Sequence, residues 1–271
     1  MVVHMKRRTR AFAFVLTIIL LISAAGCGLG GNEKYRVADK LEQQQFCVAF
    51  RLDDKAGEAV VAALKVLQAS GKVSELSNKW FGVDASELAG DDKALENLVE
   101  KPDKRTFIIG YDGGRLPFSG QENGDDATGF DVELAREVCK ELGWKAKFLP
   151  IDVSQAVVEL NSGNVDCVWG GFAYEKDNDK IYQSPVYMEN TVVLASLRSS
   201  GVRSTGGLSG KTLTLSENGY FNAILEGSKA LTEKPAYIVK VPGGTEACFK
   251  ALNDGSCAAI ITDMAALNYY D

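Results

Sequence analysis

From Phe107 onward the chain alternates short apolar runs with amphipathic stretches, and this alternation constrains the fold more than any other feature. Strands are expected at 107–110, 145–148, 165–169, 191–196, 212–215, 237–239 and 258–262, and helices at 129–142, 155–161, 220–225 and 245–252. Such alternation is typical of a doubly wound α/β fold. Two such sets of alternating strands and helices, joined at 191–197, predict two lobes with a cleft between them, where small ligands usually bind.

The helix expected at 129–142 is amphipathic, with one apolar stripe at helical spacing. That stripe consists of Val132, Ala135, Val138, Cys139 and Leu142. Asp131 and Glu133 lie near its start, where the helix dipole favours acids, and Gly143 ends it. The glycine–aromatic–acid sequence at 129–131, placed after the strand at 107–110, distinguishes this helix from an ordinary amphipathic one.

Upstream of this region the chain contains a further strand at 46–50 and a helix with an apolar face. That face comprises Val60, Val61, Leu64 and Leu67. Residues 73–82 follow as another element, ending in Trp80-Phe81-Gly82. Residues 83–104 are polar and charged, with Pro102 near the end, which indicates a linker or a solvent-side helix.

The first 26 residues have the pattern of an export signal. A basic start precedes an apolar run at 11–22, which is too short for a stable membrane span. Small residues at 23–26 before Cys27 resemble a bacterial lipobox, which implies cleavage before Cys27 and lipidation of its thiol; residues 27–33 then form a tether. The alternative is a plain secretory signal that happens to end near a cysteine.

Charge and composition exclude several classes of function. Removing residues 1–26 leaves 26 basic and 36 acidic side chains, a net charge of −10, which does not fit a nucleic-acid-binding protein. It also removes His4, the only histidine. Ser-His-Asp and Cys-His catalysis and histidine-ligated zinc are therefore excluded.

The cysteines do not have the spacing of a metal site. Five follow Cys27, and none forms a CxxC pair, so no metal is predicted. Outside the cytoplasm a disulfide is allowed, and Cys248 with Cys257 is the first pair to test. The alternative is that each thiol is simply a small buried apolar group.

Several motifs together resemble the extracellular solute-binding proteins of family 3, the polar amino-acid receptors of ABC importers. They are Asp112 with Pro117-Phe118, residues 129–132, 156–166, 184–187, 208–211 and 251–263. The resemblance implies a type II periplasmic-binding-protein-like fold, in which two α/β lobes are joined by two crossing segments.

The order of the parts departs from the family, because residues 79–82 resemble the C-terminal end of its domain. One complete set of parts in a new order indicates a circular permutation; the alternative is a domain-swapped or mis-assembled chain. The expected division is lobe one at 46–190, comprising 46–82, a linker at 83–104 and 105–190; lobe two at 34–40 and 198–271; and a hinge at 41–45 and 191–197.

The resemblance places Asp263 at the family's ammonium position and Asp112 in the first ligand loop, although either could be an ordinary turn former. The family's carboxylate-binding arginine is replaced by Asn178, and Ala173 and Glu175 occupy threonine positions. Arginine's bidentate grip is not readily replaced. Arg115 is expected either to hold the anionic end of the ligand instead or to be a solvated loop residue.

Aromatic residues near Gly171 supply further candidates: Trp169 is expected in the core, while Phe172 or Tyr174 lines the cleft. Backbone N–H groups near Gly219, before a helix, could hold an anion. The complete set of expected ligand-binding residues is Asp112, Arg115, Gly171, Phe172, Ala173, Tyr174, Asn178, Gly219 and Asp263.

The expected function is that of a monomeric, lipid-anchored receptor outside the cytoplasm. It would close on a small polar solute, such as an amino acid, and deliver it to ABC permease transmembrane subunits, with no cofactor and no catalytic residue. One alternative is an enzyme such as a cyclohexadienyl dehydratase-like protein, with Glu175 as general acid. Another is a ligand sensor.

Overall fold

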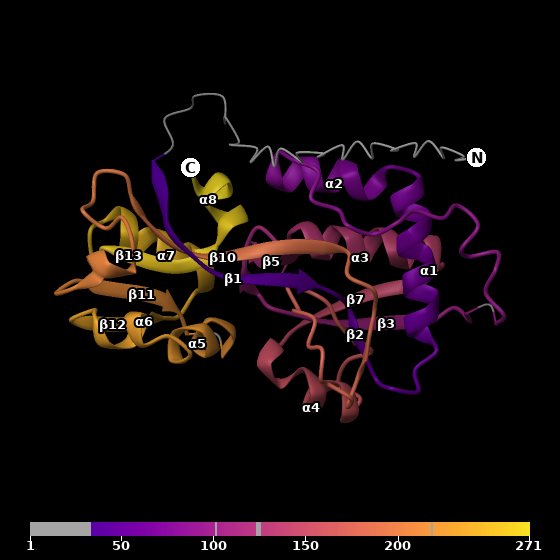
Figure 1. The fold of residues 1–271 in the computed structure, drawn as a ribbon. Helices are drawn as coiled ribbons and strands as arrows, with labels where there is room; N and C mark the ends of the chain where they lie inside the picture. Colours follow the sequence, from indigo (N-terminus) through magenta and orange to yellow (C-terminus); the bar gives the residue numbers. More distant parts are fainter. Residues whose placement is uncertain (1–33, 101, 123–125, 218) are drawn as a thin grey trace, which may run out of the picture. The chain divides into compact units, whose positions relative to one another are not determined.

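A computed structural model describes residues 34–100, 102–122, 126–217 and 219–271, which belong to one compact unit, Glu33–Asp271 (Figure 1). The expected signal, tether and lipidated Cys27 lie outside the described residues. Within these ranges, no helix combines the length and apolar character needed to cross a membrane.

The first sheet contains strands from two distant parts of the chain, in the order β7-β3-β8-β2-β9. β3 (Thr106–Tyr111) runs parallel to β7 (Lys145–Pro150) and β8 (Cys167–Val168). β2 (Ala49–Phe50) pairs antiparallel with β8 and β9 (Tyr182–Gln183). The strand upstream of residue 83 therefore lies in the same sheet as β3.

Helices cover this sheet and bury its apolar side chains. They are α1 (Ala56–Ala69), α2 (Lys72–Phe81), α3 (Phe130–Glu141) and α4 (Ala156–Asn161), with the short 3-10 helix η1 (Val153–Gln155) before α4. Figure 1 shows α2 and α3 above the strands and α4 below them, and side chains of α1 share the main core with those of α2 and α3. Phe107, Leu64 and Leu134 meet in the main core, which joins upstream and downstream segments in one lobe.

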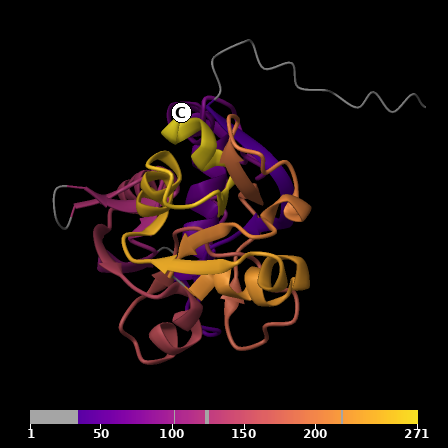
Figure 2. The same ribbon diagram turned by 90° about the vertical axis from the view of Figure 1, so that its left-hand side faces the viewer.

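The second sheet has the order β1-β10-β13-β11-β12. Its strands are β1 (Tyr35–Phe46), β10 (Met188–Leu197), β11 (Thr212–Ser216), β12 (Tyr237–Val241) and β13 (Ala259–Asp263). Its helices are η2 (Thr205–Leu208), α5 (Gly219–Glu226), α6 (Lys229–Glu233), α7 (Gly244–Asn253) and α8 (Met264–Tyr270). Figure 2 looks onto this second lobe, and the two-lobed α/β fold expected from the sequence is confirmed.

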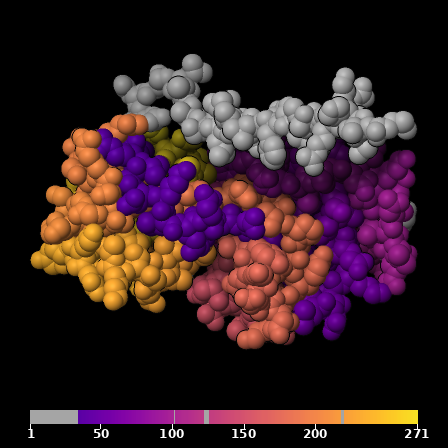
Figure 3. Space-filling view, viewed as in Figure 1, coloured from indigo at the N-terminus to yellow at the C-terminus, as the bar shows by residue number. Residues whose placement is uncertain are grey.

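Two antiparallel strands, β1 and β10, connect the lobes. Gln43 pairs with Thr191 and Gln45 with Glu189, so the two expected crossing segments lie side by side. Buried and exposed residues mix along β1, and Figure 3 shows its indigo side chains at the surface of this face.

A small third sheet was not expected from the sequence. It consists of β4 (Gly114–Arg115), β5 (Ser119–Glu122) and β6 (Asp126–Thr128), paired antiparallel. Glycine and polar residues dominate these strands, so they lack the apolar alternation by which a strand is recognised. Backbone pairing forms the sheet despite the weak pattern.

The segment at 83–104 packs on lobe one over much of its described length. Ser86 forms a β-bridge with Met188, and the Asp91 N–H donates to the Lys65 carbonyl at 3.0 Å. Leu88 and Leu95 pack against the main core. This segment is therefore attached to α1 and to the start of β10.

The five described cysteines are all free and buried, Cys248 and Cys257 included. The disulfide considered between those two is not formed. Burial raises the pKa of the Cys47 thiol to about 12, which keeps it protonated. These thiols act as small apolar groups in the core.

Candidate functional site

A buried ion pair lies where the lobes meet. Arg115, at the end of β4, donates from Nε to Asp263 Oδ2 and from Nη2 to Oδ1, both at 2.8 Å. Asp263 ends β13, and both side chains are almost completely buried. Two parallel charge-assisted bonds of this kind fix both distance and orientation.

Two of the three remaining donors of Arg115 are also engaged. Nη1 donates to the Gly171 carbonyl at 2.6 Å and Nη2 to Gln44 Oε1 at 3.1 Å, so these contacts and the two bonds to Asp263 use four of the guanidinium's five N–H groups. Burial disfavours the charged form of Arg115 and so lowers its pKa. The neighbouring Asp263 carboxylate raises the pKa by more, and the net shift is upward. A contact between Arg115 and a ligand's anionic end stays a prediction, and these four bonds leave one N–H group of Arg115 for it.

Asp131, the acid of the glycine–aromatic–acid sequence, binds the loop at Gly171, which also contacts Arg115. Asp131 is completely buried, and its carboxylate accepts the Gly171 N–H at 2.8 Å and the Tyr187 hydroxyl at 2.7 Å. Burial raises the pKa of Asp131 to about 6, although these bonds oppose the shift. Asp131 therefore positions Gly171, whose carbonyl in turn binds Arg115.

Asp131 is expected to make stability depend on pH. Its pKa is raised above the ordinary 3.8 to about 6, so between these values the folded chain keeps a proton that the unfolded chain has lost. The free energy of unfolding should then fall by up to about 3 kcal/mol as pH rises through this window. Asp131→Asn should remove that slope in urea unfolding at pH 4–7; equal slopes in both proteins would contradict the assignment.

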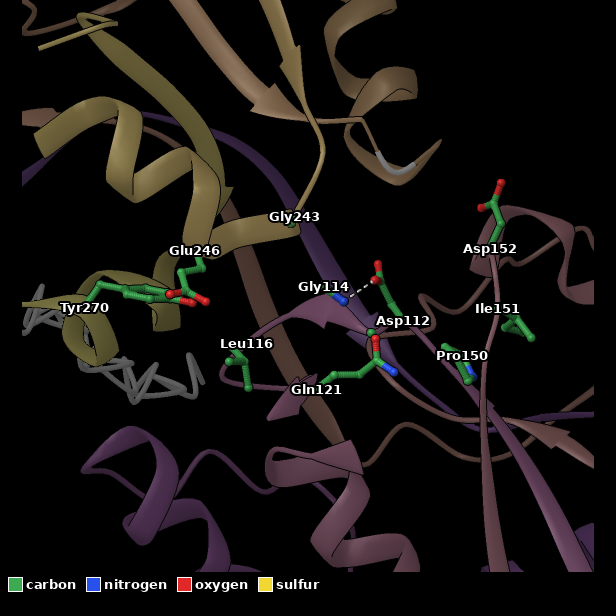
Figure 4. A pocket seen from close by; sticks show the side chains of 12 residues that line it. Asp112, Gly114, Leu116, Gln121, Pro150, Ile151, Asp152, Gly243, Glu246 and Tyr270 are labelled. Atoms are coloured by element: carbon green, nitrogen blue, oxygen red, sulfur yellow. Dashed lines mark hydrogen bonds between the residues drawn. The ribbon is translucent and has the colours of Figure 1, made fainter. Parts of the chain in front are cut away.

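A polar pocket of about 510 Å³ opens between the lobes (Figure 4), and its lining includes Gly114 and Leu116, the chain neighbours of Arg115. Lobe one contributes Asp112, Gln121 and Asp152, and lobe two contributes Glu246 and Tyr270. Three of these side chains are acidic, and none of the described lining residues is lysine or arginine. The pocket therefore carries a negative potential, which favours a positively charged solute.

Of the expected ligand-binding residues, four lie at or beside the pocket and the ion pair: Asp112, Arg115, Gly171 and Asp263. Asp112 is buried, and its carboxylate accepts the Gly114 N–H at 2.8 Å. At this position it shapes the first loop and also faces the pocket.

The other expected residues are not among the described residues that line the interlobe pocket. Phe172 is buried in a core cluster, and Tyr174 is 43% exposed. Ala173 forms a β-bridge with Phe46, and Asn178 donates to Glu175 at 2.7 Å on an exposed loop. Gly219 begins α5. Their roles in binding stay predictions.

Several site residues were not anticipated. Asn190 Nδ2 donates to Asp263 Oδ1 at 2.6 Å, and the Arg115 guanidinium lies over the Tyr220 ring at 4.3 Å. Asp152 follows β7, and Glu246 lies in the first turn of α7. Strand ends and helix starts are where acids commonly gather, but that signal does not single out these two.

Two α/β lobes joined by antiparallel crossing strands, with a polar pocket between them, define the architecture of a solute-binding protein. The chain belongs to the bacterial extracellular solute-binding proteins, family 3, whose sequence model matches residues 107–263. The family predicted from the motifs is therefore confirmed.

Named relatives support the same class. The arginine-binding extracellular protein ArtP of Bacillus subtilis is 29% identical over 178 residues, which cover 64% of this chain and 68% of ArtP. The L-cystine-binding protein TcyJ of Escherichia coli is 32% identical, over 33% of this chain and only 34% of TcyJ.

Solved structures show the same fold over part of the chain. One is an ABC uptake transporter substrate-binding protein from Streptococcus pneumoniae with bound histidine, which matches with a TM-score of 0.52 at 25% identity. The match covers 61% of this chain and 68% of the Streptococcus pneumoniae chain. The ancestral amino acid-binding protein AncCDT-1, a precursor of cyclohexadienyl dehydratase, matches with a TM-score of 0.52 at 23% identity. This match covers 61% of this chain and 73% of the AncCDT-1 chain, and it shows the fold alone.

Proposed function

We propose that this protein is the monomeric solute receptor of an ABC importer and that it captures a small cationic solute between its lobes. The acid-lined pocket carries the proposal, because Asp112, Asp152 and Glu246 face a space of about 510 Å³. Family membership and the name of the arginine-binding relative support it. Transport requires only capture and release of the solute by lobe movement, with no bond chemistry.

The charge of the solute can be tested with matched probes. L-Arginine and agmatine should bind at least about tenfold more tightly than L-citrulline, which has the shape of arginine without its charge. Isothermal titration calorimetry on the purified protein measures the three affinities. Equal affinity for L-arginine and L-citrulline would refute a cation-selective pocket.

The pocket acids should account for that preference. Asp152→Asn together with Glu246→Gln should weaken agmatine binding about tenfold, because two attractive charges are lost while side-chain shape is kept. Asp177→Asn together with Asp179→Asn, on an exposed loop, removes the same two charges; it is the matched control and should leave binding unchanged. An equal loss in the control would show that net charge alone is responsible.

The permuted order of the domain is part of this proposal. It is supported by β2 pairing with β8 within the sheet that carries β3, and by packing of the segment at 83–104 against lobe one. Lobe one would comprise 46–190, lobe two 34–40 and 198–271, and the hinge 41–45 and 191–197. A chain rebuilt with 34–82 placed after Asp271 should fold and bind the same solute; a rebuilt chain that binds nothing would argue against the permutation.

Anchoring by lipid at Cys27 is also proposed, supported by the small residues before that cysteine. An anchored receptor would stay outside the cytoplasm beside its permease partner. Metabolic labelling with a radioactive fatty acid should mark the wild-type protein and leave Cys27→Ser unlabelled; labelling of both would disprove the assignment.

An enzymatic role is the alternative, and it rests on Glu175. This side chain is exposed, and its carboxylate accepts a hydrogen bond from Asn178. A general acid in a dehydratase needs a sheltered carboxyl beside its substrate, and among described residues Glu175 does not line the interlobe pocket. Binding without turnover is therefore favoured, and both transport and sensing are consistent with it.

A further inference from the structure

The position beside Asp263 is filled by a cation that belongs to the chain itself. Asp263 is fully buried, and each carboxylate oxygen accepts one Arg115 N–H at 2.8 Å. Asn190 adds a further bond to Oδ1 at 2.6 Å. A soluble ammonium or guanidinium group can pair with Asp263 only by replacing Arg115.

Aromatic rings complete a cage around the same guanidinium. Its centre lies 4.3 Å from the Tyr220 ring and 5.0 Å from the Phe46 ring, with Phe221 at 5.6 Å. A carboxylate combined with ring faces is the set of groups that recognises a guanidinium ligand. Here the ligand of that cage is a side chain.

The partners of Arg115 come from every part of the domain. Arg115 belongs to β4 of lobe one, Asp263 and Tyr220 belong to lobe two, and Gln44 lies on the crossing strand β1. Asn190, on the other crossing strand β10, donates to both Gln44 and Asp263. One side chain therefore links both lobes to their hinge.

Two other contacts accompany this link between the lobes. A Cβ on Gly244 would lie 2.1 Å from the Gly114 carbonyl oxygen, so α7 and β4 are in direct backbone contact. The Trp80 and Tyr269 rings stack at 6.0 Å between α2 and α8. The cage therefore exists only when the lobes are together.

We propose that Arg115 is an internal guanidinium ligand, which closes the lobes on itself and excludes the amino group of a solute from Asp263. The solute is thereby left to make its charged contacts in the acid-lined pocket. The closing role stands independently of transport, whereas the exclusion of amino groups rests on the proposed solute-binding function.

Chemical rescue tests the cage directly. Arg115→Ala removes the atoms that ethylguanidine contains, so the variant should lose roughly 10 °C in Tm. Ethylguanidine at about ten times its Kd should restore about 3–5 °C. Neutral ethylurea should restore nothing, and ethylguanidine should not rescue Arg115→Ala combined with Asp263→Asn. Absence of rescue, or equal rescue by ethylurea, would overturn the proposal.

Arg115→Met, which keeps the volume but not the charge, covers the case in which the alanine variant does not fold. Small-angle X-ray scattering of solute-free protein should give a larger radius of gyration for Arg115→Met than for wild type, and ethylguanidine should not reduce it. Equal radii would refute a closing role. Loss of agmatine binding in the pocket-acid variants would still support transport, so the two proposals can fail separately.

Discussion

Asp263→Asn is expected to destabilise the protein by about 3–5 kcal/mol, because it leaves the buried Arg115 guanidinium without a counter-charge. The wild-type pair is almost completely buried, so water does not readily replace the lost carboxylate. Urea unfolding at neutral pH measures the effect as a lower midpoint with an unchanged slope.

Two further variants separate this effect from a general loss of charge. Glu100→Gln breaks the Lys55–Glu100 pair, whose side chains are 73% and 67% exposed, and should change stability by no more than about 0.5 kcal/mol. Arg115→Met combined with Asp263→Asn should recover part of the loss, since no unpaired charge remains. A loss no greater than that of Glu100→Gln would contradict the buried-pair assignment.

Gly129→Ala is expected to cost about 3–5 kcal/mol through two separate causes. Gly129 has φ +116°, which L side chains rarely adopt, and a Cβ there would lie 2.4 Å from the Phe118 carbonyl oxygen. The start of α3 would have to move, and Asp131 would move with it. A thermal melt should therefore show a Tm lower by roughly 10 °C.

Gly143→Ala is the matched control, because this residue has φ +66° but a Cβ added there would meet no atom within 4 Å beyond its chain neighbours. It should cost only about 1–2 kcal/mol from the backbone conformation. Similar losses at both glycines would mean that backbone conformation, and not close approach, explains the glycine at 129.

Secondary structure with strong periodicity was predictable from the sequence, and β4–β6 was not. The helix at 129–142 has an apolar stripe, and α3 extends over Phe130–Glu141. β5, in contrast, reads Ser-Gly-Gln-Glu, with no apolar face. Backbone hydrogen bonding between neighbouring segments forms this small sheet, and a single sequence does not record that pairing.

The location of the site was predictable from the sequence, but the contacts between its residues were not. Motifs placed Arg115 and Asp263 near the cleft, yet nothing in the sequence indicates that residues 148 positions apart bind each other. The directions of Phe172 and Tyr174 were also hidden, because Gly170 and Gly171 both have positive φ and interrupt the strand alternation just before them. Side-chain direction after such a turn depends on the surrounding packing.

The start of β1 and the end of the sequence meet at one place on lobe two. The Lys34 N–H donates to Asp271 Oδ1 at 2.8 Å, beside α8 (Figure 1). A force applied between these two residues would therefore act first on this contact within lobe two. A fluorescent protein fused after Asp271 would be attached two residues from the Tyr269 ring that stacks on Trp80 of lobe one, so its signal would be sensitive to separation of the lobes as well as to the location of the receptor.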